Sequence, residues 1–335
     1  MQSDVFTGWL YEAGIGENRA AHVVSGQLMA VRVEREQSRA IAGSIIDACF
    51  TEQWVAGRSG IATLTSGEQC LLQPVPKGLT EGAMLRVEIT RAAWDEPGGQ
   101  SKRAKAKAAP DGTLLSPGPQ LLDIIQATGD TVRPIHAQEV DHLSQLGWHE
   151  AMEQAESGRI DFSGGTLLLS VTPAMTVIDV DGSLAPFALA KEAAKQVAEA
   201  LRYFDIGGSI GVDFPSLQSK AERTEICQIF DDHMFGNCER TAINGFGFMQ
   251  IVARKKRSSI LEIMQRNKVL NAALALLRQA ERSSGSGPLQ LVVHPAIAAS
   301  FRQKSEWLDI LSQRTGRQVS VQSAGEVGLH SGQIK

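Results

Sequence analysis

The sequence predicts a multidomain protein of mixed α+β and α/β class, with a β-barrel in its first third and α/β layers after it. Three observations support this class. Short alternating segments separated by Gly, Pro and Ser fill residues 19–95. Apolar strand-like runs alternate with amphipathic helix-like runs from residue 160 onward. A short strand–helix–strand pattern follows at residues 288–324 and predicts a small final α/β domain.

The composition is that of an ordinary globular protein. The 335 residues are enough for two or three domains, and 43% hydrophobic with 21% charged residues is typical of such domains. The aromatic content of 5% argues against a surface built mainly on base stacking. A net charge of −4 gives no overall basic field, although binding of nucleic acid needs only a local basic face.

The cysteines and the first residues indicate the compartment. No CxxC pair is present, and the four cysteines are predicted to be free core residues in a reducing environment. The first 20 residues lack a basic region followed by an apolar block, and no apolar run approaches the roughly 20 residues that span a bilayer. We therefore expect a cytoplasmic protein with no membrane partner. The cysteines are Cys49, Cys70, Cys227 and Cys238.

The first third of the chain has the pattern of a small all-β unit. Alternating or β-branched segments at 20–37, 43–50, 59–75 and 83–94 predict the short strands of a barrel or sandwich. A basic stretch follows at 100–112 and ends in a Pro-Asp-Gly turn. This stretch is either a solvated loop or an RNA contact beside the barrel. Its basic residues are Lys102, Arg103, Lys105 and Lys107.

From residue 116 onward the prediction changes to helices and buried strands. Residues 116–160 are predicted to hold a few short helices, and 160–255 to follow the order β-β-α-β-α-β. Phe246 and Phe248 are predicted to pack in the core, because aromatic side chains on strands usually do so. Helices are predicted over the ranges 184–204, 219–235, 257–282 and 297–316.

Two predicted strands each finish on an aspartate. Asp179 ends the second strand of the first pair, and Asp213 ends the next strand after a helix. A right-handed crossover would make these strands parallel and close, with both carboxylates at the edge where α/β sheets bind ligands. Such a pair suits Mg²⁺, and Asp181 points to the same side if the strand continues. Alternatively, these aspartates form turns or cap helices.

The same segments resemble the ribonuclease E/G family of bacterial endoribonucleases, and the ribonuclease G branch most of all. The resemblance lies in SGGTLLLSVTPAMTVIDVDG, in ALRYFDIGGSIGVDF and in CERTAINGFGFMQIVARKKR. VVHPAIAASF and LSQRTGRQVSVQS are similar to the small terminal domain of that branch, and the first strands fall loosely where the family has its RNA-binding barrel. The resemblance implies an OB-type barrel, a deoxyribonuclease-I-like α/β catalytic layer and a small C-terminal α/β domain.

The resemblance also implies roles for single residues. Asp179 and Asp213 match the family's two aspartates that hold the catalytic Mg²⁺, and Arg240 matches a basic position near the scissile phosphate. Asp181 stands where the family has an asparagine, and we count it as a third candidate metal ligand. A group of basic residues follows the last strand of the layer. These residues either line the path of the RNA phosphates or form a solvent-exposed strand end. This group is Arg254, Lys255, Lys256 and Arg257, to which the barrel adds Lys102, Arg103 and Lys105 as candidate RNA contacts.

Two features of the family are absent from the sequence. The Cys-Pro-x-Cys hairpin that shares zinc between subunits has no counterpart near 258–273, so no zinc-linked dimer is expected. The Arg-Thr motif that grips a 5′-monophosphate has no match in 112–160. The chain thus resembles a shortened member, predicted to divide at 1–112 (first strands and barrel), 113–160 (reduced connection), 161–265 (catalytic layer) and 266–335 (helix and small domain).

The predicted function is that of a Mg²⁺-dependent endoribonuclease acting on single-stranded RNA. By resemblance, hydrolysis leaves 5′-phosphate and 3′-hydroxyl ends, in RNA processing or decay. An RNA-binding protein of the same fold that has lost cleavage is the main alternative. An α/β protein of unrelated function is a third.

Overall fold

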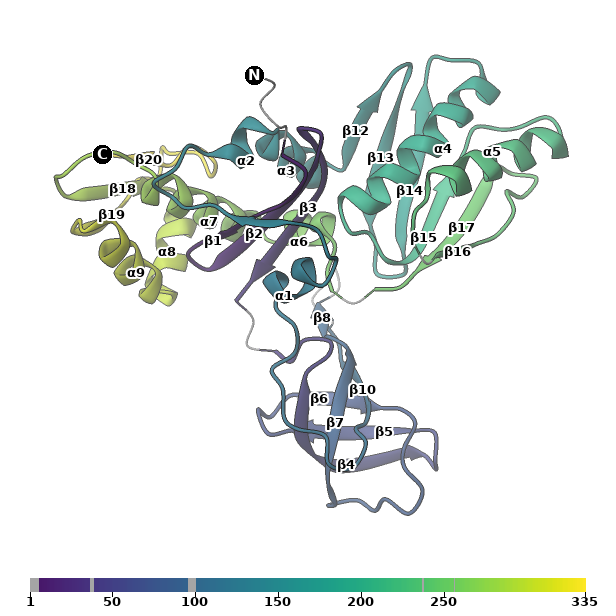
Figure 1. The fold of residues 1–335 in the computed structure, drawn as a ribbon, viewed down its shortest axis with the longest axis horizontal. Helices are drawn as coiled ribbons and strands as arrows, with labels where there is room; N and C mark the ends of the chain where they lie inside the picture. Colours follow the sequence, from purple (N-terminus) through teal and green to yellow (C-terminus); the bar gives the residue numbers. More distant parts are fainter. Residues whose placement is uncertain (1–5, 37–38, 96–100, 237, 256) are drawn as a thin grey trace. The chain divides into compact units, whose positions relative to one another are not determined.

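The computed structural model describes residues 6–36, 39–95, 101–236, 238–255 and 257–335 (Figure 1). The chain divides into two compact units, each made of separate stretches of sequence. The first comprises Met1–Glu36, Ile125–Ser157 and Ile263–Lys335. The second comprises Gln37–Ile124 and Gly158–Glu262. The predicted domain boundaries remain predictions, but this division shows that distant stretches of sequence fold together.

The first unit contains two sheets. The first strands do not join the barrel: they form a sheet of order β11-β1-β2-β3, in which β1 and β11 are parallel. A smaller sheet of order β19-β18-β20 packs with helices around a core that includes Leu277, Leu291 and Phe301. The strands are β1 (Gly8–Ala13), β2 (Glu17–Val24), β3 (Gln27–Arg35), β11 (Val132–Pro134), β18 (Leu289–Val293), β19 (Val319–Ser323) and β20 (Gln333–Ile334).

The helices of the first unit are shorter than the sequence predicts. The helix expected over 257–282 is interrupted at Asn267, whose side chain accepts a hydrogen bond from the Leu270 N–H and so caps a new helix. The helix expected over 297–316 is likewise two helices. The bounds are α2 (His142–Gln145), α3 (Trp148–Ser157), α7 (Lys268–Glu281), α8 (Pro295–Gln303) and α9 (Glu306–Thr315), with α6 (Ile260–Arg266) lying across the division.

A closed five-stranded barrel begins the second unit, as predicted. Its strands run in the order β10-β6-β5-β4-β7, with β10 parallel to β6. Inward residues such as Phe50, Leu72 and Ile89 are fully buried and fill the barrel. The bounds are β4 (Ile45–Val55), β5 (Ser59–Leu64), β6 (Gln69–Leu72), β7 (Met84–Arg91) and β10 (Ala104–Ala108); β8 (Trp94–Asp95) pairs with β9 (Ser101–Lys102), and α1 (Leu121–Gln126) follows.

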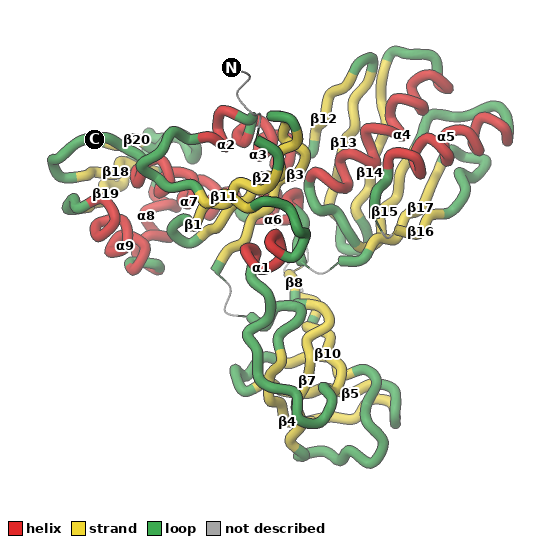
Figure 2. The backbone as a smooth tube through the Cα atoms, in the orientation of Figure 1, coloured by secondary structure: helices red, strands yellow, loops and turns green. Residues whose placement is uncertain are grey.

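The rest of the second unit is a sheet of order β12-β13-β14-β15-β17-β16 with two helices on one face (Figure 2). The predicted order β-β-α-β-α-β is confirmed, and two short edge strands, β12 and β16, are added to it. Its elements are β12 (Arg159–Phe162), β13 (Gly165–Val171), β14 (Thr176–Gly182), α4 (Pro186–Tyr203), β15 (Gly208–Asp213), α5 (Lys220–His233), β16 (Cys238–Arg240) and β17 (Phe248–Ala253).

Local sequence explains why these two helices form and which face they cover. Pro186 begins α4, where its missing N–H costs nothing, and Ser219 and Glu222 form a capping box at the start of α5. Buried alanines and leucines of α4 face the sheet, and α4 contacts β13 and β14. Among the described residues, side chains on the opposite face, such as Leu168 and Val252, are exposed, and we call this the open face.

Candidate functional site

Asp179 and Asp213 lie side by side at one edge of the open face. β14 and β15 are parallel, and their register places Asp179 opposite Asp213. Adjacent strands lie about 4.8 Å apart, so two short side chains projecting to one face at this level can reach a common ligand. Both residues are exposed, whereas Ile178 and Val212 beside them are fully buried against the helices.

The strand ends explain this placement. The crossover through α4 makes the two strands parallel, as the sequence predicts. After Asp213 comes Phe214, which is buried, and then Pro215, whose missing N–H ends the ladder. Neither aspartate caps a helix, because Ala185 precedes α4 and the side chain of Ser219 caps α5. The helix-cap interpretation of these aspartates is therefore wrong.

The neighbours of the two carboxylates follow from the register of the sheet. Residues that are paired across a ladder share a face, so one row crosses the open face perpendicular to the strands. It runs Arg159, Leu168, Asp179, Asp213 and Phe248, from β12 to β17. A cation and an apolar side chain thus lie on the β13 side of the carboxylates, and an aromatic ring lies on the β17 side.

Asp181 lies on the same face but one step beyond this row. It is exposed and pairs with Thr166 of β13, and its Oδ1 accepts a hydrogen bond from the Gly182 N–H at 2.8 Å. Within the described ranges, no group of three or more His, Cys, Asp or Glu side chains is placed to hold a metal. The arrangement fits Mg²⁺ that takes two protein carboxylates and fills its other positions with water and phosphate oxygens.

Arg240 does not share the face of the aspartates. It pairs with Ile251, which is fully buried on the helix-covered face. Its guanidinium binds both carboxylate oxygens of Asp231 on α5, with Nε 2.8 Å from Oδ1, and Nη2 donates to the Cys227 carbonyl at 3.4 Å. The hydrogen bond to Asp231 also raises the pKa of Arg240. The structure thus connects Arg240 with α5 and not with Asp179 and Asp213.

The basic residues after β17 lie at the other end of the sheet. Gly208 pairs with Ala253, whereas Asp213 pairs with Phe248, so five residues, or about 17 Å of strand, separate the two ends. Lys255 forms an ion pair of 2.6 Å with Glu262, and Arg257 forms one of 2.6 Å with Asp205. Arg254 is exposed, and Lys256 lies outside the described residues.

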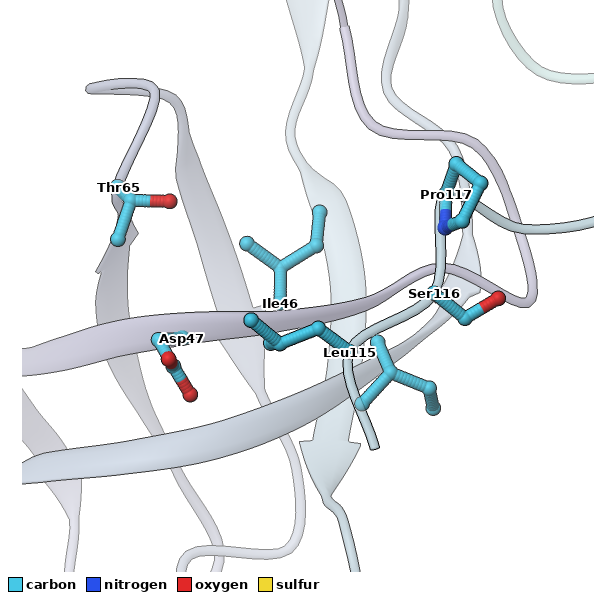
Figure 3. Close-up of a pocket in the computed structure, with 7 residues that line it drawn as sticks. Ile46, Asp47, Thr65, Leu115, Ser116 and Pro117 are labelled. Carbon is cyan, nitrogen blue, oxygen red and sulfur yellow. The ribbon is translucent and has the colours of Figure 1, made fainter. Parts of the chain in front are cut away.

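The basic residues of the barrel are accessible. Lys102 and Arg103 are exposed and Lys105 is half-buried, and Arg103 donates to Gln69 Oε1 at 3.3 Å. A shallow pocket of ≈ 290 Å³ also lies on the barrel wall (Figure 3). Its one carboxylate, Asp47, is held by Arg86 at 2.8 Å, so it offers no free metal-binding group. The pocket is lined by Ile45, Ile46, Asp47, Thr65, Leu115, Ser116 and Pro117.

The prediction that Phe246 packs in the core is wrong, because its side chain is 89% exposed. Phe248 is half-buried on the open face. A Cβ added to Gly211 would lie 2.5 Å from the Phe248 ring, so the ring covers β15 at the position of this glycine. An aromatic surface therefore lies next to Asp213.

Arg159 is the cation on the open face, and sequence reasoning missed it. Its side chain is 55% exposed and lies 2.7 Å from Asp161, and it also donates to the Thr166 hydroxyl at 3.1 Å. The hydrogen bond from Thr166, followed by that from Arg159, lowers the pKa of Asp161. The available signal was the two-residue link between Arg159–Phe162 and the next strand, which predicts a hairpin and hence a shared face.

These observations describe a mixed α/β protein with a closed β-barrel and a pair of strand-end carboxylates on an open sheet face. Residues 120–257, which contain the carboxylate pair, match the family described as the Ribonuclease E/G family. This match covers less than half of the chain, and over that segment the chain is similar to a family of ribonucleases. Among the described residues, no helix is both long enough and apolar enough to cross a bilayer.

Similar curated proteins carry ribonuclease names. Ribonuclease G of Haemophilus influenzae is 28% identical over 131 residues, which are 35% of this chain and 27% of that protein. Ribonuclease E of a Nostoc species is 29% identical over 126 residues, 34% of this chain and 18% of the relative. Ribonuclease G of Escherichia coli is 26% identical over 114 residues, 30% and 23% of the two chains. The matches thus span about a quarter or less of these relatives.

Proposed function

We propose that this protein is a Mg²⁺-dependent endoribonuclease that cleaves single-stranded RNA in processing or decay. The observation that carries the proposal is the register of Asp179 and Asp213, two exposed carboxylates on adjacent parallel strands. The match of residues 120–257 to a ribonuclease family supports the substrate class and the reaction. In this proposal the six-stranded sheet is the deoxyribonuclease-I-like catalytic layer.

The barrel is proposed to be of the OB type and to hold RNA. Numbered along the chain, its five strands are joined in the cyclic order one, two, three, five, four, with the third and fifth parallel. This Greek-key arrangement supports the OB assignment, and barrels of that type bind oligonucleotides on one face. Lys102, Arg103 and Lys105 would contact phosphates of the RNA there.

Asp179 and Asp213 would hold the Mg²⁺, with Asp181 one step away on the same face. When bound, this ion supplies charge neutralisation at the phosphate and an activated water. Without a cation the two carboxylates would repel the phosphodiester, so they act as a substrate site only in its presence. Attack of water on phosphorus breaks the bond to the 3′ oxygen, which gives 5′-phosphate and 3′-hydroxyl ends.

The remaining residues of the row would position the RNA. The guanidinium of Arg159 can bind a phosphate beside the scissile one. It would give up its ion pair with Asp161, which is solvent-exposed and therefore weak. Leu168 and Phe248 border the carboxylates with apolar surface on each side. The prediction that Arg240 acts on the scissile phosphate remains open to test, and its place on the helix-covered face favours a role in holding α5.

The test is cleavage of a labelled A/U-rich single-stranded RNA in Mg²⁺ and in EDTA. Asp179→Asn and Asp213→Asn should each lower the rate about 1,000-fold or more, as expected when roughly 4 kcal/mol of barrier lowering is lost. Asp111→Asn, which changes an exposed aspartate in a barrel-side turn, is the matched control and should cleave normally. Full activity in either site variant, or in EDTA, would overturn the assignment.

A catalytically inactive RNA-binding protein of the same fold is the second candidate. The position of Arg240 favours it, because the expected arginine is absent from the face of the carboxylates. RNA binding that is weakened by salt, with no Mg²⁺-dependent cleavage, would support this alternative.

A further inference from the structure

The loop between β16 and β17 lies at the end of the sheet that holds Asp179 and Asp213. It carries Phe246, whose aromatic ring is exposed to solvent. We propose that Phe246 stacks on a base of single-stranded RNA whose phosphate lies at Asp179 and Asp213. The inference rests on the proposed function for its ligand, but it concerns a residue with a different role. Single exposed apolar residues are common, so exposure alone does not carry it.

The first supporting observation is that hydrogen bonds hold the loop backbone that carries the ring. The Asn244 side chain accepts hydrogen bonds from the N–H groups of Phe246 and Phe248, at 2.8 and 3.1 Å. Its backbone pairs with the same turn, through Gly247 N–H at 3.2 Å and Phe248 carbonyl at 3.0 Å. Because the loop backbone is already ordered, less conformational entropy is lost when the ring binds a ligand.

The second observation is that the loop is fastened to the strand of Asp213. The N–H of Phe214 donates to the Gly247 carbonyl at 3.1 Å. Gly247 has φ +91°, and a Cβ there would lie 2.4 Å from the Phe214 carbonyl oxygen. This close approach ties Phe246 to the residue that follows Asp213.

The third observation is a second aromatic side chain, Phe248, two residues after Phe246 and next to Asp213. The Phe248 ring covers Gly211 on the open face and lies in the same row as Asp213. Phe246 and Phe248 are therefore two aromatic groups on one side of the carboxylates, one half-buried and one 89% exposed. The Phe248 ring covers the strand beside Asp213, and the exposed Phe246 ring is available to the ligand.

Stacking is the interaction that fits such a ring beside a phosphate site. The faces of unpaired bases in single-stranded RNA are accessible, whereas duplex bases already stack on each other. Stacking on an aromatic side chain tolerates any base, so this contact would favour unpaired RNA without reading its sequence. One well-placed ring is sufficient for that selection, which is compatible with an aromatic content of only 5%.

The test uses the full chain with Asp213→Asn, so that bound RNA stays intact, and short single-stranded RNAs with one 2-aminopurine at successive positions. Stacking on the ring should quench the fluorescence at one position. Adding Phe246→Ala should abolish that quench and weaken binding about ten-fold, as for one lost base contact, while Phe246→Trp should preserve both.

The matched control is Phe235→Ala in the same background. Phe235 is 71% exposed but precedes β16, whose Cys238 pairs with Ala253 at the end of the sheet remote from Asp213. The control should leave the quench and the affinity unchanged. An equal effect of Phe235→Ala, or an undiminished quench in Phe246→Ala, would overturn the inference. A change of oligomeric state in Phe246→Ala with unchanged RNA signals would also overturn it, by assigning the ring to a protein contact.

The two proposals can fail separately. If the quench depends on Phe246 but the unsubstituted chain does not cut RNA, stacking is supported and the nuclease proposal is rejected. Mg²⁺-dependent cutting by the unsubstituted chain with no Phe246-dependent quench would do the reverse.

Discussion

Arg240 can serve either the chemistry or the packing of α5, and one substitution separates these roles. Arg240→Gln removes the guanidinium that Asp231 and the Cys227 carbonyl share. We expect the free energy of unfolding to fall by about 1–3 kcal/mol, since charged hydrogen bonds are lost. We expect the cleavage rate per folded molecule to stay within a few-fold. A hundred-fold slower reaction at unchanged urea stability would instead place Arg240 in catalysis.

Arg159 should contribute one phosphate contact. Replacing it with alanine removes the cation from the row of the carboxylates. The slope of log affinity against log salt concentration should then become shallower by about 0.7, the value for one contact with a single strand. Titrations of RNA at several salt concentrations measure this slope. Arg302→Ala, at an exposed arginine of α8, should leave the slope as it was.

The difference between these two arginines shows what the sequence could not predict at the residue scale. The strand ends at Asp179 and Asp213 follow from apolar runs and a crossover, and their parallel pairing was predicted correctly. The face on which Arg240 lies depends instead on its register with Ile251 across a loop of seven residues. A shift of that register by one residue would move Arg240 to the open face, and no local pattern fixes it.

At the scale of single elements, the conformation of the β16–β17 loop depends on one glycine, Gly247. Gly247→Ala should destabilise the loop by about 1–3 kcal/mol, because φ is +91° and the added methyl group would meet the Phe214 carbonyl. RNA cleavage should fall with it, because Asp213 adjoins that contact. Gly245→Ala is the matched control, since a Cβ there has nothing within 4 Å. Urea unfolding of both variants is the measurement, and equal stabilities would contradict the expectation.

Elements were predicted where the sequence is periodic and missed where they are short. α4 has the composition of a helix with Pro186 at its start, α5 has a capping box, and β13, β14 and β15 are apolar runs, so all five were predicted. β11, β12 and β16 have only three or four residues each, too few to show a period. Their positions come from partners far away in the chain, as in the pairing of Trp9 with Val132.

At the scale of the whole molecule, a buried ionic network joins distant parts of the first unit. Arg19, whose side chain is 1% exposed, binds Glu12 and lies 3.0 Å from Asp141. Glu17 on the same strand lies 2.8 Å from Arg35 and 3.0 Å from Arg278 on α7. The pairs with Asp141 and Arg278 hold β2 to residues more than a hundred positions away, so the stability of this unit should depend on their charge.

Acid should therefore destabilise the first unit. Burial acts to raise the pKa of Glu17, but Arg278 and Arg35 outweigh it and lower the pKa from its ordinary value of 4.5. A lowered carboxylate pKa gives stability that is present above the ordinary value and is lost as the pH falls below it. Burial also acts to raise the pKa of Asp141, but Arg19 and the hydrogen bonds from Ser144 hold this pKa well below its usual range. Asp141 therefore adds to the loss of stability in acid.

The measurement is urea unfolding between about pH 3 and pH 7. Stability should decline as the pH falls below 4.5, the ordinary value for Glu17. Glu17→Gln should lower stability at neutral pH by about 3–5 kcal/mol, because two arginines lose a buried partner, and should flatten the decline. Glu326→Gln, at an exposed glutamate, is the control. An identical acid slope in Glu17→Gln and the unsubstituted chain would exclude the network as the cause.

The order of the six-stranded sheet places its two shortest strands, β12 and β16, at its margins. Each carries charges of both signs, Arg159 with Asp161 on one side and Glu239 with Arg240 on the other. A strand from another molecule could add only three or four residues of ladder and would have to dehydrate those charges. The sheet is thereby protected from the edge-to-edge association that leads to fibrils, even though one of its faces is exposed.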